Sequence, residues 1–555
     1  MKILADKIFP ENLPIIAEIF DKYRTRQLAE GQKVTRYAPS PTGFMHLGNL
    51  YSAFISERVG HGSNGIFFLR IEDTDEKREV EGAVDVIVEA LNYFDLKCDE
   101  GRGINGVEVG MYGPYTQSHR KHIYQAFVKH LVENGRAYPC FCSEEELETI
   151  INQQKAQNCP RLGYYGNWAK YRNFPIEEAM RKIENNEKYV VRFKSLGNFN
   201  NKVVINDVIR GNLEFPENDL DVVIMKKNGL PTYHFAHVVD DFLMGTTTVV
   251  RGDEWMPSLP LHVQLFQAMK WKAPKYAHVS PLLKIEENEN KRKLSKRKDP
   301  EANVEYFREA GYPKESVLEY LLNLANPGFE DWKRQNPNKK YSEFSFNIKK
   351  MNVSGALFDL AKLNNISRDV IGRMSSTEMY DDVTTWAEKY DKKLFDLILK
   401  NREYVLKIFG IERENVKNPR KDIAKWSDIG VEIECFFELE KETVKRKLME
   451  FPVDDVTNII KLFLNSYNEE DSNQQWFEKL KIVAKDCGYA GNIKEYKENP
   501  SKFKGDISQV AKILRIVITG REQSPDLYSI MKVLGRKTVI ERLDGLFVEG
   551  QSELK

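Results

Sequence analysis

The sequence has few cysteines and no excess of either charge. Its 555 residues contain only 6 cysteines, too few and too scattered for a disulfide framework, which favours a reducing compartment. The 83 Lys and Arg residues balance 83 Asp and Glu residues, so overall basicity gives no reason to expect a nucleic-acid partner. The length and a composition of 41% hydrophobic and 30% charged residues exclude a mini-protein, a disordered chain and a fibrous chain.

Long apolar runs are also missing. Even Val317–Ala325 carries Glu319 and Asn323, whereas a membrane span needs about 20 apolar residues. Residues 1–7 lack the apolar core of a signal peptide and the Arg-rich character of a transit peptide. We therefore expect a cytoplasmic protein with no membrane partner.

Strand and helix patterns alternate through the first half of the chain. A single helical extension is predicted over residues 1–31. Strand patterns then alternate with helix patterns, with strands at 33–38, 65–71, 246–251 and 278–284 and helices at 46–59, 80–94, 119–134 and 259–269. This alternation predicts an α/β fold with a doubly wound parallel sheet.

The remaining patterns predict an insertion and a helical second half. Residues 137–230 interrupt the alternation with an irregular α+β block, in which Asn228-Gly229 between two strand-like runs predicts a hairpin. Beyond Glu301 the patterns are nearly all helical, with helix start and stop signals such as Gly311 and Pro313.

A turn near the N-terminus has the character of a phosphate site. A predicted strand ends in a loop stiffened by Pro39 and Pro41, and His46 to Asn49 begin a helix. Helix N-termini present unpaired N–H groups and partial positive charge, which favour phosphate. His46 and Asn49 lie one turn apart, so both can donate to one anion. The alternative is an ordinary turn with a capping histidine.

A basic run lies in the middle of the chain, Lys291-Arg-Lys-Leu-Ser-Lys-Arg-Lys-Asp299. We expect it to form a mobile loop that closes over a triphosphate and neutralises charge on a leaving pyrophosphate. Taken alone, such a run is more often a solvated surface. Its combination with the upstream turn favours the nucleotide site.

These segments resemble a known family. Arg36-Tyr-Ala-Pro-Ser-Pro-Thr-Gly with His46-Leu-Gly-Asn49 resembles the "HIGH" region of class I aminoacyl-tRNA synthetases, and Lys293-Leu-Ser-Lys-Arg297 resembles their "KMSKS" loop. The whole set is similar to glutamyl-tRNA synthetases of the bacterial type. Further matches in family order are Arg70-Ile-Glu-Asp-Thr-Asp75, Gly113-Pro-Tyr-Thr-Gln-Ser-His-Arg120, Tyr233-His-Phe-Ala-His-Val-Val-Asp-Asp241, Arg251-Gly-Asp-Glu-Trp255 and Gly520-Arg-Glu-Gln-Ser-Pro-Asp-Leu527.

The resemblance implies ATP-dependent ligation of L-glutamate to tRNA(Glu) through a glutamyl-adenylate, with Mg²⁺ balancing phosphate charge. Glutamate carries two carboxylates and one ammonium, so its site needs two cations and an anion. By resemblance the glutamate-binding residues are Arg36, Ala38, Ser40, Glu72, Tyr233, His237 and Arg251. The ATP-binding residues are His46, Gly48, Asn49, Glu254, Trp255, Lys293, Ser295 and Lys296, of which His46, Asn49, Lys293 and Lys296 are the catalytic candidates.

The resemblance also implies a domain arrangement and a monomer. Residues 32–136 and 231–300 are expected to form the two halves of the Rossmann-like catalytic domain, with the acceptor-stem-binding insertion at 137–230 between them. Residues 301–374 are expected to contact the tRNA stem, and residues 375–555 to bind the anticodon. No anticodon-reading residue is assigned.

Two features depart from the family pattern. His237 stands where one bacterial form has Asn and glutaminyl enzymes have His, which keeps glutamine open as the substrate. Arg251 favours glutamate, because a buried Arg facing a neutral carboxamide would lack its partner. Cys140, Cys142 and Cys159 are similar to a zinc loop, but Trp168 stands where a further Cys is expected, so a metal-free hairpin is preferred over zinc.

Three alternatives remain open from the sequence. The chain can be a glutaminyl-tRNA synthetase, although that form should carry β-rich sequence after residue 350. It can be a relaxed enzyme that also glutamylates tRNA(Gln). It can also be an inactive tRNA-binding scaffold, although such a chain should lose His46, Glu72 or Lys296, and none is lost.

Overall fold

The structure is a computed structural model. It describes residues 1–75, 80–286, 288–295, 297–413 and 416–550, and side chains up to residue 545. The chain divides into two compact units. The first unit comprises Met1–Phe307 and Leu318–Asp359, and the second comprises Arg308–Val317 and Leu360–Lys555.

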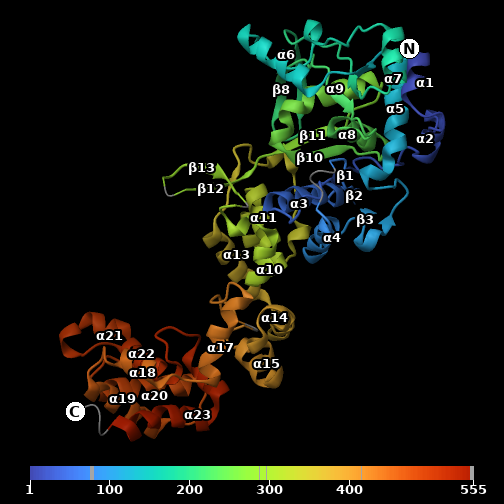
Figure 1. The fold of residues 1–555 in the computed structure, drawn as a ribbon. Helices are drawn as coiled ribbons and strands as arrows, with labels where there is room; N and C mark the ends of the chain where they lie inside the picture. The colour runs from blue at the N-terminus through green and yellow to red at the C-terminus, as the bar shows by residue number, and fades with distance from the viewer. Residues whose placement is uncertain (76–79, 287, 296, 414–415, 551–555) are drawn as a thin grey trace. The chain divides into compact units, whose positions relative to one another are not determined.

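Two four-stranded sheets, built mainly of parallel strands, form the centre of the first unit (Figure 1). On one side β1 pairs in parallel with β2 and β2 with β3, while on the other side β10 pairs in parallel with β11. The two sides meet where Thr247 N donates to Val34 O over 2.9 Å. The strands are β1 (Val34–Tyr37), β2 (Ile66–Leu69), β3 (Glu100–Arg102), β10 (Thr248–Gly252) and β11 (Lys275–Val279), with β4 (Glu108–Val109) antiparallel at the edge.

These strands are short and mostly buried. All four residues of β1 are buried, and the hydroxyl of Thr35 donates to Ser56 O over 2.7 Å. Parallel strands are covered by helices on both faces. The associated helices are α3 (Leu47–His61), α4 (Ala83–Tyr93), η2 (Gln117–Arg120), α5 (Lys121–Glu133), α8 (Tyr233–Leu243), η4 (Asp253–Ser258) and α9 (Leu259–Ala268). The predicted doubly wound α/β fold is confirmed.

The inserted segment adds strands to the sheet that contains β10 and β11. Its hairpin β7–β8 joins β11 in parallel at Asp207 opposite Tyr276, while β5, β6 and β9 form a separate antiparallel sheet. The elements are β5 (Ala137–Cys140), α6 (Glu144–Ala156), η3 (Gly166–Trp168), α7 (Ile176–Glu184), β6 (Val190–Phe193), β7 (Lys202–Asp207), β8 (Gly211–Pro216) and β9 (Val223–Met225). The insertion therefore places Asp207 beside β11 of this sheet.

The turn at Asn228-Gly229 differs from the prediction. Gly229 adopts a positive φ of 78° and the chain reverses there, as expected. However, only Pro231 bridges back to Met225, and helix α8 begins at Tyr233. The prediction of a second strand is wrong, because the apolar residues after Tyr233 belong to the buried face of a helix.

The N-terminal extension is two helices instead of one. Helices α1 (Lys2–Ile8) and α2 (Ile16–Lys22) are separated by the segment that contains Pro10 and Pro14, which cannot continue a helix. Both pack against α5, where Asp6 pairs with Lys129 at 2.7 Å and the Phe20 and Phe127 rings lie 6.0 Å apart. The extension thus belongs to the hydrophobic core of the first unit.

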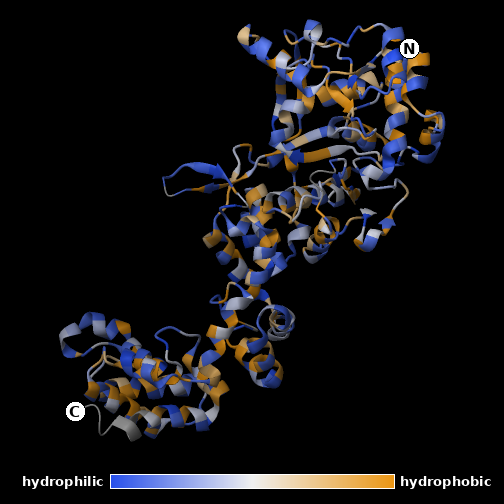
Figure 2. Cartoon of the chain, in the orientation of Figure 1, coloured by the Kyte–Doolittle hydropathy of each residue, from blue (hydrophilic) through white to orange (hydrophobic). Residues whose placement is uncertain are grey.

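The basic run begins as a strand. β12 (Leu282–Ile285) pairs antiparallel with β13 (Lys291–Lys293), and β12 also pairs with the two-residue strand β14 (Ala356–Leu357). The predicted single strand at 278–284 is therefore two strands, β11 and β12. Figure 2 shows the β12–β13 hairpin in blue, because it is largely hydrophilic.

Helices follow the hairpin in both units. They begin with η5 (Pro300–Ala302), α10 (Val304–Ala310), α11 (Lys314–Ala325), α12 (Gly328–Gln335), η6 (Tyr341–Glu343) and η7 (Ile348–Lys350). The second unit continues with α13 (Leu360–Arg373), α14 (Ser376–Tyr390), α15 (Lys392–Lys400), α16 (Arg402–Gly410), η8 (Trp426–Asp428), α17 (Ile429–Phe437), α18 (Lys441–Leu448), α19 (Val453–Ser466), α20 (Asn473–Asp486), α21 (Ile493–Glu498), η9 (Pro500–Lys502), α22 (Ile507–Thr519) and α23 (Leu527–Gly550).

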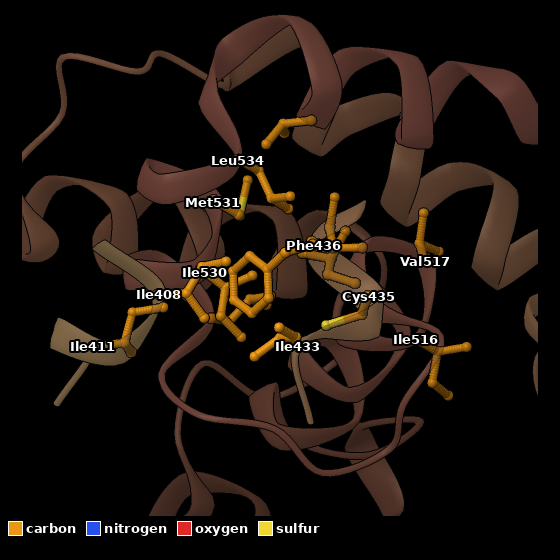
Figure 3. Close-up of a cluster of buried hydrophobic side chains, with 14 of the residues drawn as sticks. Ile408, Ile411, Ile433, Cys435, Phe436, Ile516, Val517, Ile530, Met531 and Leu534 are labelled. Carbon is orange, nitrogen blue, oxygen red and sulfur yellow. The ribbon is translucent and has the colours of Figure 1, made fainter. Parts of the chain in front are cut away.

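An apolar core joins helices of the second unit. Side chains from α16, α17, α22 and α23 meet around Phe436 (Figure 3). Several of the helices begin at residues whose side chains accept a backbone N–H, such as Ser375, Asp391 and Ser472. The predicted all-helical second half is confirmed. No helix within the described ranges has the length and apolarity of a membrane span.

Candidate functional site

A cavity of about 750 Å³ lies at the carboxyl ends of the central strands. In open parallel sheets this edge is where ligands bind. Twelve residues predicted for the site line it, namely Arg36, Ala38, Ser40, His46, Gly48, Asn49, Glu72, Tyr233, Arg251, Glu254, Trp255 and Lys293. The structure thus brings one wall predicted for nucleotide and one predicted for glutamate into a single space.

His46 is the N-cap of helix α3. Its Nδ1 accepts a hydrogen bond from Gly48 N over 2.9 Å. In the neutral ring the proton therefore sits on Nε2, which makes that nitrogen the donor. A Cβ at Gly48 would lie only 3.2 Å from His46 Nδ1, so glycine keeps the start of the helix open. This end of α3 is suited to an anion.

Arg36 is held by a buried carboxylate. From β1 its Nε donates to Asp241 Oδ1 over 3.2 Å, and its Nη1 donates to Val250 O over 3.3 Å. Arg70 Nη1 donates to the same Asp241 oxygen over 2.8 Å. Burial alone would raise the pKa of Asp241, but Arg36 and Arg70 outweigh it and hold that pKa well below its usual range. Asp241 therefore stays charged and provides a counter-ion for the Arg36 guanidinium.

Glu72 lies at the end of β2 and faces the cavity. Arg70 Nη2 donates to its Oε1 over 3.0 Å. Burial raises the pKa of Glu72, while Arg70 and Arg36 oppose that shift. An ionised Glu72 offers a carboxylate to an ammonium group of a ligand.

Arg251 lies on β10 and is 5% exposed. The groups that accept hydrogen bonds from its guanidinium are neutral. Its Nε donates to His278 Nε2 over 3.0 Å, its Nη1 donates to His262 Nδ1 over 3.1 Å, and its Nη2 lies 3.5 Å from Trp255 O. The guanidinium carbon also lies 4.8 Å from the centre of the Tyr276 ring. No salt bridge joins Arg251 to any Asp or Glu within the described parts of the chain.

Tyr233 and Trp255 form an aromatic part of the wall. Their ring centroids lie 4.2 Å apart. Burial raises the pKa of Tyr233, so its hydroxyl stays protonated. The pair offers a flat apolar surface and a hydroxyl beside Arg251.

His237 does not line the cavity. It is fully buried on α8, with Nε2 3.0 Å from the Tyr276 hydroxyl and Nδ1 2.7 Å from Asp241 Oδ2. Burial lowers the pKa of His237 to about 3, so the ring is neutral. Its position behind the wall arises because α8 directs the residue four positions before Asp241 toward the core. Among the described residues, His237 is therefore not one that would touch a ligand in the cavity.

The basic hairpin reaches the cavity through Lys293. Lys293 Nζ lies 3.9 Å from Glu254 Oε2, and both side chains are exposed. Ser295 does not line the cavity; its backbone N–H donates to Asp299 Oδ2 over 2.9 Å. Asp299 also accepts two hydrogen bonds from Arg292. Lys296 lies outside the described residues. The start of the predicted mobile loop is thus an ion-paired hairpin.

The cavity also has lining residues that no sequence motif assigned a role. Among them are Tyr37, Pro39, Thr74, Asp75, Lys226, Thr232 and His234. Lys226 Nζ donates to Thr74 O over 2.7 Å and so ties the insertion to the loop after β2. His234 could have been identified from its place beside Tyr233 in the quoted motif, whereas Lys226 has no such signal.

In the cysteine loop, two thiols lie near the same hydroxyl group. Cys140 Sγ and Cys142 Sγ each lie 3.5 Å from the Tyr164 hydroxyl. Within the described residues there is no group of three or more His, Cys, Asp or Glu side chains that could hold a metal ion.

Comparison with known proteins identifies both parts of the chain. A family model described as tRNA synthetases class I (E and Q), catalytic domain, matches residues 32–365, and a model of an anticodon binding domain matches residues 378–546. The glutamate–tRNA ligase of Acetivibrio thermocellus is 48% identical, covering 98% of this chain and 99% of the relative. That of Sorangium cellulosum is 40% identical, covering 94% and 96%.

A solved structure has the same fold. The crystal structure of a glutamate tRNA ligase from Elizabethkingia meningosepticum in complex with its amino acid matches with a TM-score of 0.72 and 27% identity, covering 93% of this chain and 99% of that chain. The matches span the catalytic sheet, the cavity and the helical half. The chain belongs to the E and Q family of class I tRNA synthetases.

Proposed function

We propose that this enzyme ligates L-glutamate to tRNA(Glu) in two steps. The α-carboxylate of glutamate attacks the α-phosphorus of ATP, and pyrophosphate leaves. A terminal ribose hydroxyl of the tRNA then attacks the glutamyl carbonyl, and AMP leaves. The observation that carries the proposal is that Arg36, Glu72 and Arg251 line the same cavity as the His46 turn.

On the nucleotide side, we assign the phosphates to the start of α3. His46 Nε2 and the Asn49 amide are donors one helical turn apart, and Gly48 leaves room for the nucleotide. Lys293 also lines the cavity and would neutralise charge on the leaving pyrophosphate, together with Ser295 and Lys296. Glu254 and Trp255 are assigned to the adenosine. Because the substrate carboxylate is the nucleophile, the reaction needs no covalent intermediate with the protein.

On the amino-acid side, the charges of the wall match those of glutamate. Glu72 is assigned to the ammonium group, and Arg36 and Arg251 to the two carboxylates. Ala38, Ser40 and the Tyr233 hydroxyl complete the wall. Arg251, which has no carboxylate partner among the described residues, favours glutamate over glutamine, because a neutral amide would leave its charge without a counter-ion.

The assignments outside the cavity rest on the family relationship. Residues 137–230 would hold the acceptor end of the tRNA, residues 301–374 its stem, and residues 375–555 the anticodon. We also propose that the enzyme acts as a monomer in the cytoplasm. Size-exclusion chromatography with light scattering, with and without tRNA, checks the oligomeric state.

The test is aminoacylation by the purified protein. Glutamate and glutamine are offered separately with tRNA(Glu) and with tRNA(Gln), and tRNA-dependent ATP–pyrophosphate exchange reports the first step. We expect charging of tRNA(Glu) with glutamate and its loss in Lys296→Ala. Preferential charging with glutamine would refute the amino-acid assignment, and glutamylation of tRNA(Gln) would identify the relaxed form of the enzyme.

A further inference from the structure

The two arginines assigned to glutamate differ in what surrounds their charge. Arg36 shares Asp241 with Arg70, so a carboxylate already lies against its guanidinium. Arg251 is as deeply buried, yet the groups that accept its hydrogen bonds are two histidine nitrogens and the backbone oxygen of Trp255, none of which carries a formal charge. A buried charge without a counter-ion costs several kcal/mol unless a ligand supplies one. This contrast requires an arrangement that keeps both histidines neutral and correctly oriented.

Asp207 fixes the ring of His278. Its Oδ2 lies 2.7 Å from His278 Nδ1, and the same carboxylate accepts backbone N–H groups from Ile209, Arg210 and His278. The proton of the neutral ring must therefore sit on Nδ1, which leaves the lone pair of Nε2 for Arg251 Nε. The His278 ring also separates Asp207 from Arg251, so the carboxylate orients the partner without pairing with the guanidinium itself.

The second acceptor is fixed from the other side. Since Arg251 Nη1 can only donate, His262 Nδ1 accepts and its Nε2 carries the proton. That Nε2 lies 3.0 Å from His234 Nδ1, which accepts it, and His234 lines the cavity. Both His262 and His278 are fully buried. Burial lowers the pKa of each, which keeps both rings neutral.

From this network we infer that Asp207, His278, His262 and His234 are positioning residues for Arg251. They hold its guanidinium through neutral acceptors, so that its charge is left for the side-chain carboxylate of the substrate. This inference rests on the proposed function and extends it, because it makes the discrimination of glutamate from glutamine depend on residues behind the cavity wall. It also gives the insertion, through Asp207 of β7, a part in amino-acid selection.

His262 allows a matched test of charge. In His262→Asn the amide oxygen can take the place of Nδ1 as a neutral acceptor, and in His262→Asp a carboxylate of nearly the same size takes that place. Both variants leave the same space behind, so they differ in charge alone. We expect the Asp variant to have a KM for glutamate about 10- to 100-fold above that of the Asn variant, because its carboxylate neutralises Arg251.

The readout is aminoacylation of tRNA(Glu) with glutamate and with glutamine. The ratio of kcat/KM for glutamate to that for glutamine should fall at least about tenfold in His262→Asp relative to His262→Asn, while the KM for ATP stays within about threefold. Equal glutamate KM values, or an equal ratio, in the two variants would overturn the positioning role. A wild-type protein that does not use glutamate would instead overturn the proposed function itself.

Substitutions of His278 provide a second matched pair of variants in case the His262 variants do not fold. His278→Gln keeps an oxygen acceptor for Arg251 Nε, whereas His278→Phe keeps a ring but removes the acceptor. The Phe variant should show a KM for glutamate about 10- to 100-fold above that of the Gln variant, because a charged donor loses its partner. Equal KM values in this pair would show that His278 only fills space, which contradicts the inference.

Discussion

The ionisation of Glu72 depends on two opposing effects. Burial raises the pKa of its carboxyl group, and Arg70 and Arg36 pull it down. Arg70 occupies Oε1, while the described residues offer no hydrogen-bond donor to Oε2. A carboxylate with one occupied and one available oxygen is suited to the ammonium group of an amino acid. The same balance makes the residue sensitive to acid.

Replacement of Glu72 tests this role. In Glu72→Gln the KM for glutamate should rise about 100-fold, because the ammonium loses a charged acceptor, while the KM for ATP stays within about threefold. In the wild type, 1/KM for glutamate should fall as the pH is lowered toward the raised pKa of Glu72, since the protonated carboxyl carries no charge. Steady-state kinetics between about pH 5.5 and 8 check both. An unchanged KM for glutamate in the variant would remove Glu72 from the site.

Helix α3 depends on His46 in two ways. The ring caps the helix by accepting from Gly48 N, with His46 itself in the extended conformation at φ −83° and ψ 145°. The same bond places the proton of the neutral ring on Nε2, which we propose as a donor to an anion at the helix start. A single substitution to alanine therefore removes a structural and a chemical contribution together.

Two variants of His46 separate these contributions. Asn is among the best N-cap residues, so His46→Asn should keep the free energy of unfolding of the wild type, whereas His46→Ala should lose about 1 kcal/mol. Both should lose about 100-fold or more in kcat of ATP–pyrophosphate exchange, because neither carries the Nε2 donor. Urea unfolding followed by fluorescence and exchange kinetics provide the measurements. Full activity in His46→Asn would show that the histidine serves only as a cap.

Histidines are distributed unequally over the chain. All nine histidines lie between His46 and His278, in the first unit, and the second unit has none. Burial is the main cause that lowers the pKa of His234, His237, His262 and His278. The pKa of His61 is raised instead, mainly through its hydrogen bond with Glu57. Acid should therefore act mostly on the first unit.

The direction of this effect follows from proton uptake. Below about pH 6.5 the unfolded chain binds protons that these four histidines do not bind in the folded protein, so each lowers the free energy of unfolding by up to about 1.4 kcal/mol per pH unit. His61 offsets part of this loss. Hydrogen exchange at pH 7.5 and 5.5, corrected for intrinsic rates, should show reduced protection in β10 and β11 and little change in α22. Equal losses in both units would contradict the prediction.

Local signals in the sequence located most elements of the molecule. The helix predicted over 259–269 is α9 (Leu259–Ala268), and the strand predicted over 33–38 is β1. The failures have local causes as well. Pro10 and Pro14 divide the N-terminal extension, and Ser280-Pro281 separates β11 from β12. The family assignment is confirmed. It could be made from the sequence because its motifs are short segments that need no knowledge of packing.

The sequence by itself determined the α/β and helical halves and the family, and it predicted which segments carry the nucleotide and glutamate chemistry. Hydrophobic period, prolines and helix caps act within a few residues, so they can be read along the chain. Only the tertiary structure decided that Asp241 neutralises Arg36, that His237 lies behind the wall, and that neutral histidines hold Arg251. These pairings join distant parts of the chain, and the packing of α8, α9 and β11 against the sheet sets which groups meet.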